Sequence, residues 1–260
     1  MQRAHFAMTD QDIEAIERAT IAAVSPEAVQ ALDGWLLPFD GGTVGRAKSA
    51  VPLSHSAINS VAAGALLERL QAQYASQNLP CMLRLADVDG FAPLRHVLTQ
   101  HGYVSSRPTW VQVGTVDAMR QVCAQAPADV DNAPDAAWAA LFLGEGFDPV
   151  DGASRVRSLS RAQGSAYASL RQEGKTVAAG AGAFSHGWAS VHGMRTAVGY
   201  RGQGLAGRVL AALAQAAAQK GLRRVFLQVE ASNPAAQALY RRAGFETAWS
   251  YMYWSRPVSS

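Results

Sequence analysis

Hydrophobic positions in the first hundred residues alternate between helical and strand spacing. Thr9 is a candidate N-cap with Asp12 three residues later, and apolar residues then follow at helical spacing. A short apolar run over 35–39 and a turn at 40–42 predict a strand and its return. The same criteria predict helices over 60–75 and 91–100, and strands over 43–51, 81–85 and 103–113.

The second half of the chain has the same kind of pattern, with clearer turns. Helical spacing predicts helices over 134–143 and 150–163. Glycine-containing turns then separate three apolar segments, which predicts antiparallel strands over 165–171, 176–184 and 188–196. A glycine-rich loop follows, and the order continues as helix, strand, helix and strand over 205–220, 225–229, 234–243 and 247–256.

The two halves repeat this order of elements. A shift of 142 residues places Gly102-Tyr103 on Gly244-Phe245 without gaps, although few residues are identical. A repeat of this length indicates tandem domains rather than a solenoid. We therefore predict an α/β (α+β) protein with two domains, 1–125 and 126–260, each a mixed, largely antiparallel sheet flanked by helices. Residues 115–134 are poor in large apolar side chains and form the predicted connection.

Composition and charge narrow the classes of function. Hydrophobic residues make up 49% of the 260, yet no apolar run approaches the roughly 20 residues of a membrane helix. The first twelve residues lack the pattern of a signal peptide, and the two cysteines have no zinc-binding spacing. The net charge of +3 is spread along the chain, without the basic face of a nucleic-acid reader. We expect a cytoplasmic protein without a metal site that binds neither membranes nor nucleic acid.

The strongest chemical signal is the loop Arg201-Gly202-Gln203-Gly204, between a predicted strand and a predicted helix. Its glycines let the backbone approach a ligand closely, and the N-terminus of the following helix adds partial positive charge. No Lys-Ser/Thr pair follows, so the loop is not a P-loop, and it lacks the full glycine spacing of a dinucleotide fold. We interpret it as a cradle for a pyrophosphate.

Two motifs in the same order resemble the GCN5-related N-acetyltransferase (GNAT) superfamily. The loop over 201–206 resembles its acetyl-CoA motif, Arg/Gln-x-x-Gly-x-Gly/Ala. The strand over 225–229, Asn233, a helix with Tyr240, and Gly244-Phe245 resemble its second motif. The resemblance covers residues 136–254, and the first half resembles the degenerate first copy of tandem, bacterial-type members.

The resemblance implies an N-acetyltransferase that uses acetyl-CoA as cosubstrate. The strand with Met194, Arg195 and Thr196 is then expected to pair with the pantetheine arm as an added strand. Asn233 is expected to contact pantetheine or an ordered water, and Tyr240 to lie near the thioester sulfur. The residues expected to bind the pyrophosphate are Arg201, Gly202, Gln203, Gly204, Leu205 and Ala206.

Direct attack of an amine on the thioester needs a proton donor, a proton acceptor and a group that stabilises the oxyanion. A phenol with a pKa of about 10 can protonate a thiolate whose conjugate acid is near 8.5, so Tyr240 is the expected acid. His192 is the first candidate for the base, because strict alternation places it on one strand face with Met194 and Thr196. In this feature the chain resembles the serotonin-type acetyltransferases, which have a histidine at the same offset before the loop. Glu230 is the second candidate, and a strand amide at or near Met194 is the expected oxyanion donor. Structural roles for His192 and a packing role for Tyr240 stay open.

The first half loses the functional residues under the same shift. Arg201 falls on Asn59, Gly204 on Ala62 and Tyr240 on Leu98. We therefore expect a structural copy that completes the acceptor cleft, with the hairpin over 40–46 as a substrate contact.

The acceptor itself is not fixed by the motifs. The leading hypothesis is acetylation of a primary amine on a small molecule or a protein, and the alternative is a non-catalytic acyl-CoA-binding regulatory module. Glu145, Asp148 and Asp151 either attract a cationic amine or form an ordinary solvated loop. We expect a monomer, since a tandem copy can replace a partner, with a dimer as the alternative.

Overall fold

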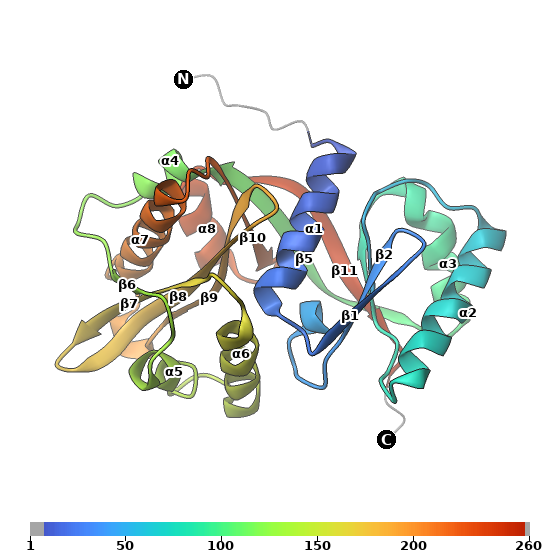
Figure 1. The fold of residues 1–260 in the computed structure, drawn as a ribbon, viewed down its shortest axis with the longest axis horizontal. Coiled ribbons are helices and arrows are strands. Elements are labelled where there is room, and N and C mark those ends of the chain that lie inside the picture. Colours follow the sequence, from blue (N-terminus) through green and yellow to red (C-terminus); the bar gives the residue numbers. More distant parts are fainter. Residues whose placement is uncertain (1–7, 258–260) are drawn as a thin grey trace.

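The structure is a computed structural model that describes residues 8–257 (Figure 1). Residues 1–7, part of the segment searched for a signal peptide, lie outside the described residues. One sheet has eight strands in the order β4-β11-β5-β10-β9-β8-β7-β6, and a second has the order β1-β2-β3. The first half contains α1 (Asp10–Val24), β1 (Ala28–Leu32), β2 (Trp35–Phe39), β3 (Val51–Pro52), α2 (Ser60–Ser76), β4 (Leu83–Ala86), α3 (Ala92–Gln100), β5 (Val104–Thr115) and α4 (Val116–Arg120). The second contains β6 (Asp129–Asp131), α5 (Ala136–Leu141), α6 (Pro149–Arg161), β7 (Ala166–Gln172), β8 (Lys175–Ser185), β9 (Trp188–Thr196), α7 (Leu205–Gln219), β10 (Arg224–Glu230), α8 (Pro234–Arg242) and β11 (Glu246–Ser255).

The order of elements is the same in the two halves. The series α1-β1-β2-β3-α2-β4-α3-β5 corresponds to α6-β7-β8-β9-α7-β10-α8-β11, and the shift of 142 residues places α3 on α8 end to end. The predicted fold class is confirmed: the protein is mixed α/β, with largely antiparallel sheets flanked by helices.

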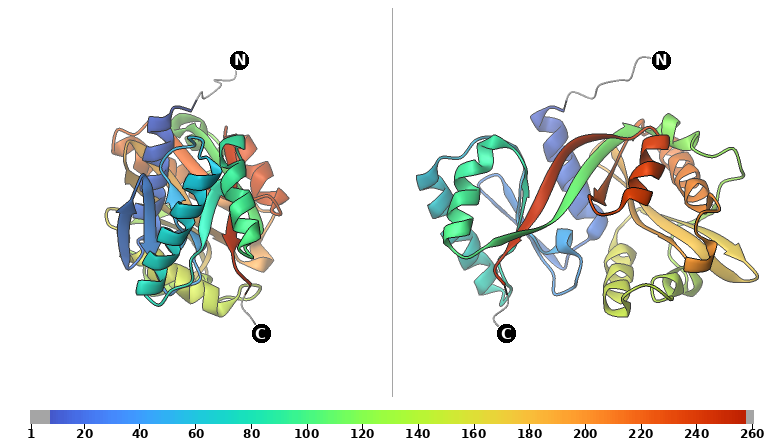
Figure 2. Two further views of the ribbon diagram at one scale, coloured as in Figure 1. Left: turned by 90° about the vertical axis from the view of Figure 1, so that its right-hand side faces the viewer. Right: turned by 180° about the vertical axis from the view of Figure 1, so that it is seen from behind.

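Each half contributes its last strand to the sheet of the other half. β11 pairs with β4, β5 pairs with β10, and β5 and β11 pair with each other, all antiparallel. Figure 2 shows these two long strands side by side, running from one lobe to the other. A parallel bridge between Ala50 and Leu83 joins the small sheet to the large one. Residues on both sides of the predicted boundary at 125 thus share one sheet, and the two-domain assignment stays a prediction.

Two predicted segments differ from the structure. The predicted strand over 43–51 is a 3-10 helix at Gly45–Ala47 followed by the two residues of β3. The reason is that the backbone N–H of Thr43 donates to Ser154 Oγ at 2.8 Å, on α6, so this segment docks on the second half. The connection over 115–134 contains α4 and the edge strand β6, which pairs with β7.

Helix α1 begins at the predicted N-cap and packs on the second half. Thr9 Oγ1 accepts from the N–H of Asp12, and the Asp12 carboxylate accepts from the N–H of Thr9, which confirms the capping box. Its buried face carries Ile13 and Ile16 and covers β8 and β9, so α1 lies between the two lobes (Figure 1). The first half therefore contributes both a helix and a strand to the core of the second.

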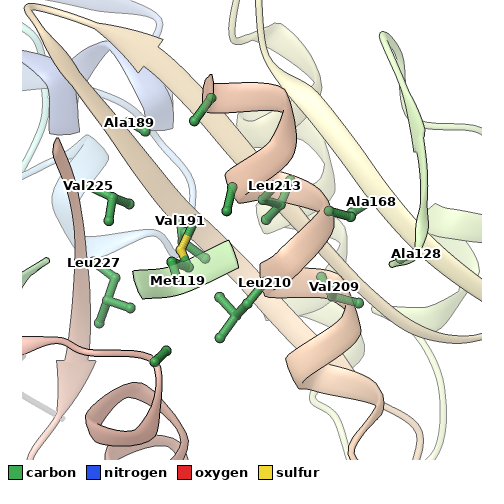
Figure 3. Packing of buried hydrophobic residues seen from close by; sticks show 14 of the residues in the cluster. Met119, Ala128, Ala168, Ala189, Val191, Val209, Leu210, Leu213, Val225 and Leu227 are labelled. Atoms are coloured by element: carbon green, nitrogen blue, oxygen red, sulfur yellow. The ribbon is translucent and has the colours of Figure 1, made fainter. Parts of the chain in front are cut away.

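Helix α7 is held in place by an apolar core on one face of the large sheet. Val209, Leu210 and Leu213 are buried against Val191 and Leu227 of the neighbouring strands (Figure 3). This packing fixes the position at which α7 begins, and that position matters for the glycine-rich loop just before it. Of the helices within residues 8–257, none is long and apolar enough to cross a bilayer.

Candidate active site

The large sheet opens between β9 and β10. The two strands pair in parallel only where Val225–Leu227 faces Ala189–Val191. Beyond that point β10 continues with β5 as far as Glu230, and β9 continues with β8 as far as Thr196. The edge of β9 that faces the opening therefore keeps unpaired backbone groups, which suits an extended ligand that binds as an added strand.

A β-bulge lies on β9 at the opening. The register shifts between Ala179 and Ala181 of β8, and Gly193 has a φ of +59°, a conformation that favours glycine. His192 lies near Phe226 on the face that α1 covers, whereas Met194 packs with the core of α7. The prediction that His192 and Met194 share a strand face is wrong, because the bulge inserts one residue between them.

The glycine-rich loop presents open backbone groups at the start of α7. Gly202 and Gly204 have φ angles of +78° and +76°, and no atom lies within 4 Å of where a Cβ on either would stand. Gly204 is the N-cap of α7 and has no side chain to bond the first amides of the helix. The guanidinium of Arg201 donates weakly to the carbonyl of Thr196, at 3.4 Å, and its residue is exposed. The loop therefore fits the pyrophosphate cradle expected from the sequence.

A cavity of about 290 Å³ lies at the opening. It brings together six of the site residues expected from the sequence, which come from β9, from the end of β10 and from α8: His192, Met194, Arg195, Glu230, Asn233 and Tyr240. Thr196 and the cradle residues 201–206 lie outside its lining. The cradle and the cavity are linked through Phe147, whose ring lies 4.3 Å from the Arg195 guanidinium and 5.8 Å from that of Arg201.

Tyr240 is positioned by a capped helix. Asn233 Oδ1 accepts from the N–H of Ala236 at 3.1 Å and begins α8, and Pro234 occupies its first turn. The Tyr240 side chain is 7% exposed, contacts Phe245 and lines the cavity. Burial raises the pKa of its phenol to about 12. The phenol of Tyr240 is therefore protonated at neutral pH, and the residue lines the cavity into which a proton could be donated.

His192 is buried and neutral. Its Nε2 lies 2.8 Å from Ser190 Oγ, and only 4% of the residue is exposed. Burial, with a smaller effect of the Arg46 cation, lowers its pKa to about 3. An imidazole with this pKa forms hydrogen bonds but binds a proton weakly.

Comparison with known proteins identifies the family. A family model described as "Probable histone acetyltransferase Rv0428c C-terminal" matches residues 10–254. The chain belongs to this acetyltransferase family. The fold is that of the GNAT superfamily, and comparison with curated proteins gives no match. A GCN5-related N-acetyltransferase from Kribbella flavida is 19% identical with a TM-score of 0.68, over 95% of this chain and 96% of its own.

Two further solved structures share the fold over nearly the whole chain. A GCN5-related N-acetyltransferase from Sphaerobacter thermophilus is 18% identical with a TM-score of 0.59, over 98% of this chain and 96% of its own. A tandem GNAT protein from the clavulanic acid biosynthesis pathway is 13% identical with a TM-score of 0.62, over 96% of this chain and 89% of its own. These identities support the GNAT fold and leave the acceptor open.

The GNAT fold of this chain also builds its cavity from residues that the sequence motifs did not indicate. They come from β5, β10, β11 and α6, and they include Arg107, Thr109, Arg155, Gln228, Tyr251 and Tyr253. Four of them, two from β5 and two from β11, depend on the exchange of these strands, which no local pattern in the sequence reveals. The expected contact from the hairpin over 40–46 is present in part, since Val44, Gly45 and Arg46 line the cavity.

Of the three acidic side chains over 145–151, two form contacts within the protein. Asp148 Oδ1 accepts from the N–H groups of Val150 and Asp151 and so caps α6. Burial acts to raise the pKa of Asp151, but hydrogen bonds from Arg155 and Thr43 outweigh it and hold that pKa below its usual range. Within residues 8–257, Glu145 forms no ion pair and does not line the cavity. The idea that these acids attract a cationic amine is thus not supported by their contacts.

Proposed function

We propose that the protein transfers an acetyl group from acetyl-CoA to a primary amine by direct attack of the amine on the thioester. The observation that carries the proposal is the opening between β9 and β10, whose cavity Tyr240 lines and which Phe147 links to the cradle before α7. The residues fit this cosubstrate, because the loop offers open amides at a helix N-terminus and β9 offers an unpaired edge. When bound, the thioester supplies an activated acyl carbon.

The cradle and the β9 edge have separate binding roles in this proposal. The amides over 203–206, with Arg201, hold the pyrophosphate, and the edge over 194–196 pairs with the pantetheine. Asn233 uses its Oδ1 to cap α8, so its amide NH2 group is left to contact the pantetheine arm. The bulge at Gly193 leaves a backbone amide at or near Met194 to stabilise the oxyanion.

The proton transfers are assigned from burial and position. Tyr240 is assigned to protonate the departing thiolate, because the residue lines the cavity and its phenol carries a proton at neutral pH. Of the two candidates for the proton acceptor we favour Glu230, which is exposed at the end of β10 and lines the cavity. His192 then serves as a neutral hydrogen-bonding group oriented by Ser190.

The first half is proposed to be a structural copy without a cradle of its own. Helix α2 corresponds to α7, yet Asn59 Oδ1 accepts from the N–H of Ala62 at 2.9 Å and so occupies the helix N-terminus. Leu98, which corresponds to Tyr240, is fully buried in apolar surroundings. One acyl-CoA per chain is expected, in a protein that we expect to be a monomer.

Calorimetric titration with acetyl-CoA tests the cradle. We expect one site per chain, with binding weakened at least about tenfold by Gly204→Glu, since a carboxylate there repels the pyrophosphate. Gly204→Ala is the matched control, because it carries the same strain at φ +76° without the charge. Two sites per chain would contradict the assignment of the first half, and no binding by the wild type would refute the proposed function.

Tyr240→Phe separates the enzyme from the alternative, a non-catalytic acyl-CoA-binding regulatory module. That alternative is favoured by the low pKa of His192, which leaves only Glu230 as a base. If the protein is an enzyme, we expect the rate of thiol release to fall about 100-fold or more while acetyl-CoA binding is unchanged. Tyr103→Phe, in another apolar cluster and outside the cavity lining, is the control and should retain the rate. Equal rates in wild type and Tyr240→Phe would remove Tyr240 from the mechanism.

A further inference from the structure

The cavity has an excess of positive charge. Its lining includes four arginines, from the 3-10 helix at Gly45–Ala47, β5, α6 and β9, and one carboxylate, from β10: Arg46, Arg107, Arg155, Arg195 and Glu230. The cradle that is proposed for the pyrophosphate lies outside this lining. The excess therefore needs an explanation of its own.

Two of the four cations are already in ion pairs within the protein. Asp151 lies 2.5 Å from Arg155 Nε and 3.6 Å from Arg195, so these two arginines share one carboxylate. In the part of the chain that the structure describes, neither Arg46 nor Arg107 forms an ion pair with a carboxylate. Among these same residues, the buried Nε of Arg46 has no hydrogen-bond partner. A buried guanidinium nitrogen without a partner is costly, and an anion from outside would relieve that cost.

The unpaired arginines are held in place by built contacts. Arg46 Nη1 donates to Gln228 Oε1 at 3.2 Å, and the same oxygen accepts from the Tyr251 hydroxyl at 2.9 Å. Gln228 Nε2 in turn donates to Thr20 on α1 at 2.9 Å. Elements from both halves thus fix Arg46 at the cavity.

Arg107 also lines the cavity and lies close to Gly45, the residue before Arg46. Its guanidinium lies 4.3 Å from the centre of the Tyr253 ring, and its backbone has a φ of +50°. Gly45 packs closely on both Tyr253 and Arg107. A Cβ on Gly45 would stand 2.9 Å from the Tyr253 ring and 3.1 Å from Arg107. Burial and the Arg107 cation lower the pKa of the neighbouring Lys48, which reflects the same local excess of positive charge.

We infer that Arg46 and Arg107 bind an oxyanion of the acceptor, so that the acceptor is an amine that also carries a carboxylate or a phosphate. This inference rests on the proposed transferase function. Arginine forks match carboxylate and phosphate oxygens, and both arginines face the cavity that Tyr240 lines. A lysine within a basic peptide would instead bring more positive charge to a cationic wall, and is disfavoured.

The same charges favour the reactive form of the amine. Cations near a bound amine disfavour its ammonium form and lower its pKa. A weaker base is then sufficient to deprotonate the amine in the cavity. This agrees with the neutral state of His192. One acidic group on the acceptor binds the arginines and leaves its amine free to turn toward the β9 edge.

Binding of simple oxyanions tests the inference without knowledge of the acceptor. Glutarate and inorganic phosphate are titrated into the full chain saturated with CoA, followed by calorimetry and thermal shift. We expect Arg46→Gln with Arg107→Gln to weaken the binding of at least one probe about tenfold or more. Arg157→Gln, an exposed arginine outside the cavity on α6, is the matched control and should bind as the wild type does. Stronger binding of glutarate points to a carboxylate, and stronger binding of phosphate to a phosphate.

Other outcomes separate the failure of this inference from that of the proposed function. Equal binding by the double variant and the wild type, or no binding by either, overturns the inference. Substitution of the partly buried Arg46 could disturb the fold. The single variant Arg107→Gln, at an exposed residue, avoids this problem and should weaken probe binding in part. Gly204→Glu should lose acetyl-CoA and, when titrated without CoA, still bind the probe. If it does so while the wild type binds no acetyl-CoA, the anion site stands and the transferase function fails.

A kinetic comparison uses amines that differ only in the acid group. β-Alanine and 4-aminobutyrate are compared with their amides by the rate of thiol release from acetyl-CoA. We expect kcat/KM to be about tenfold higher for the acids, and the preference to disappear in Arg107→Gln. Amides or a lysine-rich peptide that react faster than the acids would overturn the inference.

Discussion

Residues 126–260 produced without the first half should not fold. This fragment lacks β5, which lies between β10 and β11, so both of these strands would expose an unpaired edge. It also loses Val111 and Val113 of β5 and the α1 residues that cover β8 and β9. We expect circular dichroism and thermal melting to show no cooperative transition, and most of the fragment to aggregate.

Production of the two parts together is the control for this experiment. Residues 1–125 supply α1, β4 and β5, and should restore soluble material that contains both pieces and melts cooperatively. A fragment 126–260 that melts cooperatively on its own would show that the exchanged strand is dispensable. It would also support the predicted boundary as a boundary between independent domains.

Arg84→Met should destabilise the protein by about 3–5 kcal/mol. Arg84 on β4 and Glu17 on α1 form an ion pair at 2.6 Å, with side chains 0% and 3% exposed. Burial raises the pKa of Glu17, and the Arg84 cation opposes that effect. Loss of the arginine leaves a buried carboxyl group without its partner. Chemical denaturation at neutral pH measures the change in the free energy of unfolding.

The pH dependence and a second substitution make this prediction specific. A carboxyl group whose pKa is raised in the folded state does not destabilise the protein when the pH is below its pKa in the unfolded state. As the pH rises above that value, the group costs stability. Arg84→Met should therefore lose more stability relative to wild type at pH 7 than at pH 4. Adding Glu17→Leu should recover most of the loss, because no buried charge then remains. Equal stability of Arg84→Met and wild type at pH 7 would contradict the role of the pair.

Local signals in the sequence account for much of the fold. Thr9 and Asp12 fixed the start of α1 because a capping box depends on residues three apart. The repeat spacing of 142 residues aligned α3 with α8, because the two helices have the same length and each is followed by a turn. The edge strand β6 was missed because its three residues, Asp129–Asp131, are exposed and carry no apolar alternation.

Some residues of the candidate site could be predicted from local sequence motifs, and others could not. Asn233, Tyr240 and the cradle belong to short motifs, so the sequence indicated them together. Arg107 and Tyr253 reach the cavity only through pairing between strands more distant in sequence, which leaves no local pattern. The face of Met194 was predicted wrongly because one extra residue at a bulge reverses strand alternation.

The exchanged strands have a consequence for biosynthesis. β4 pairs with β11, which is the last strand made, so the first half cannot complete its sheet while it leaves the ribosome. At roughly 5–20 residues per second, the wait is on the order of ten seconds. During that time the edge of β4 and the buried face of α1 are open to chaperones and to neighbouring nascent chains. We therefore expect the sheet of the first half to be completed only after β11 has been made.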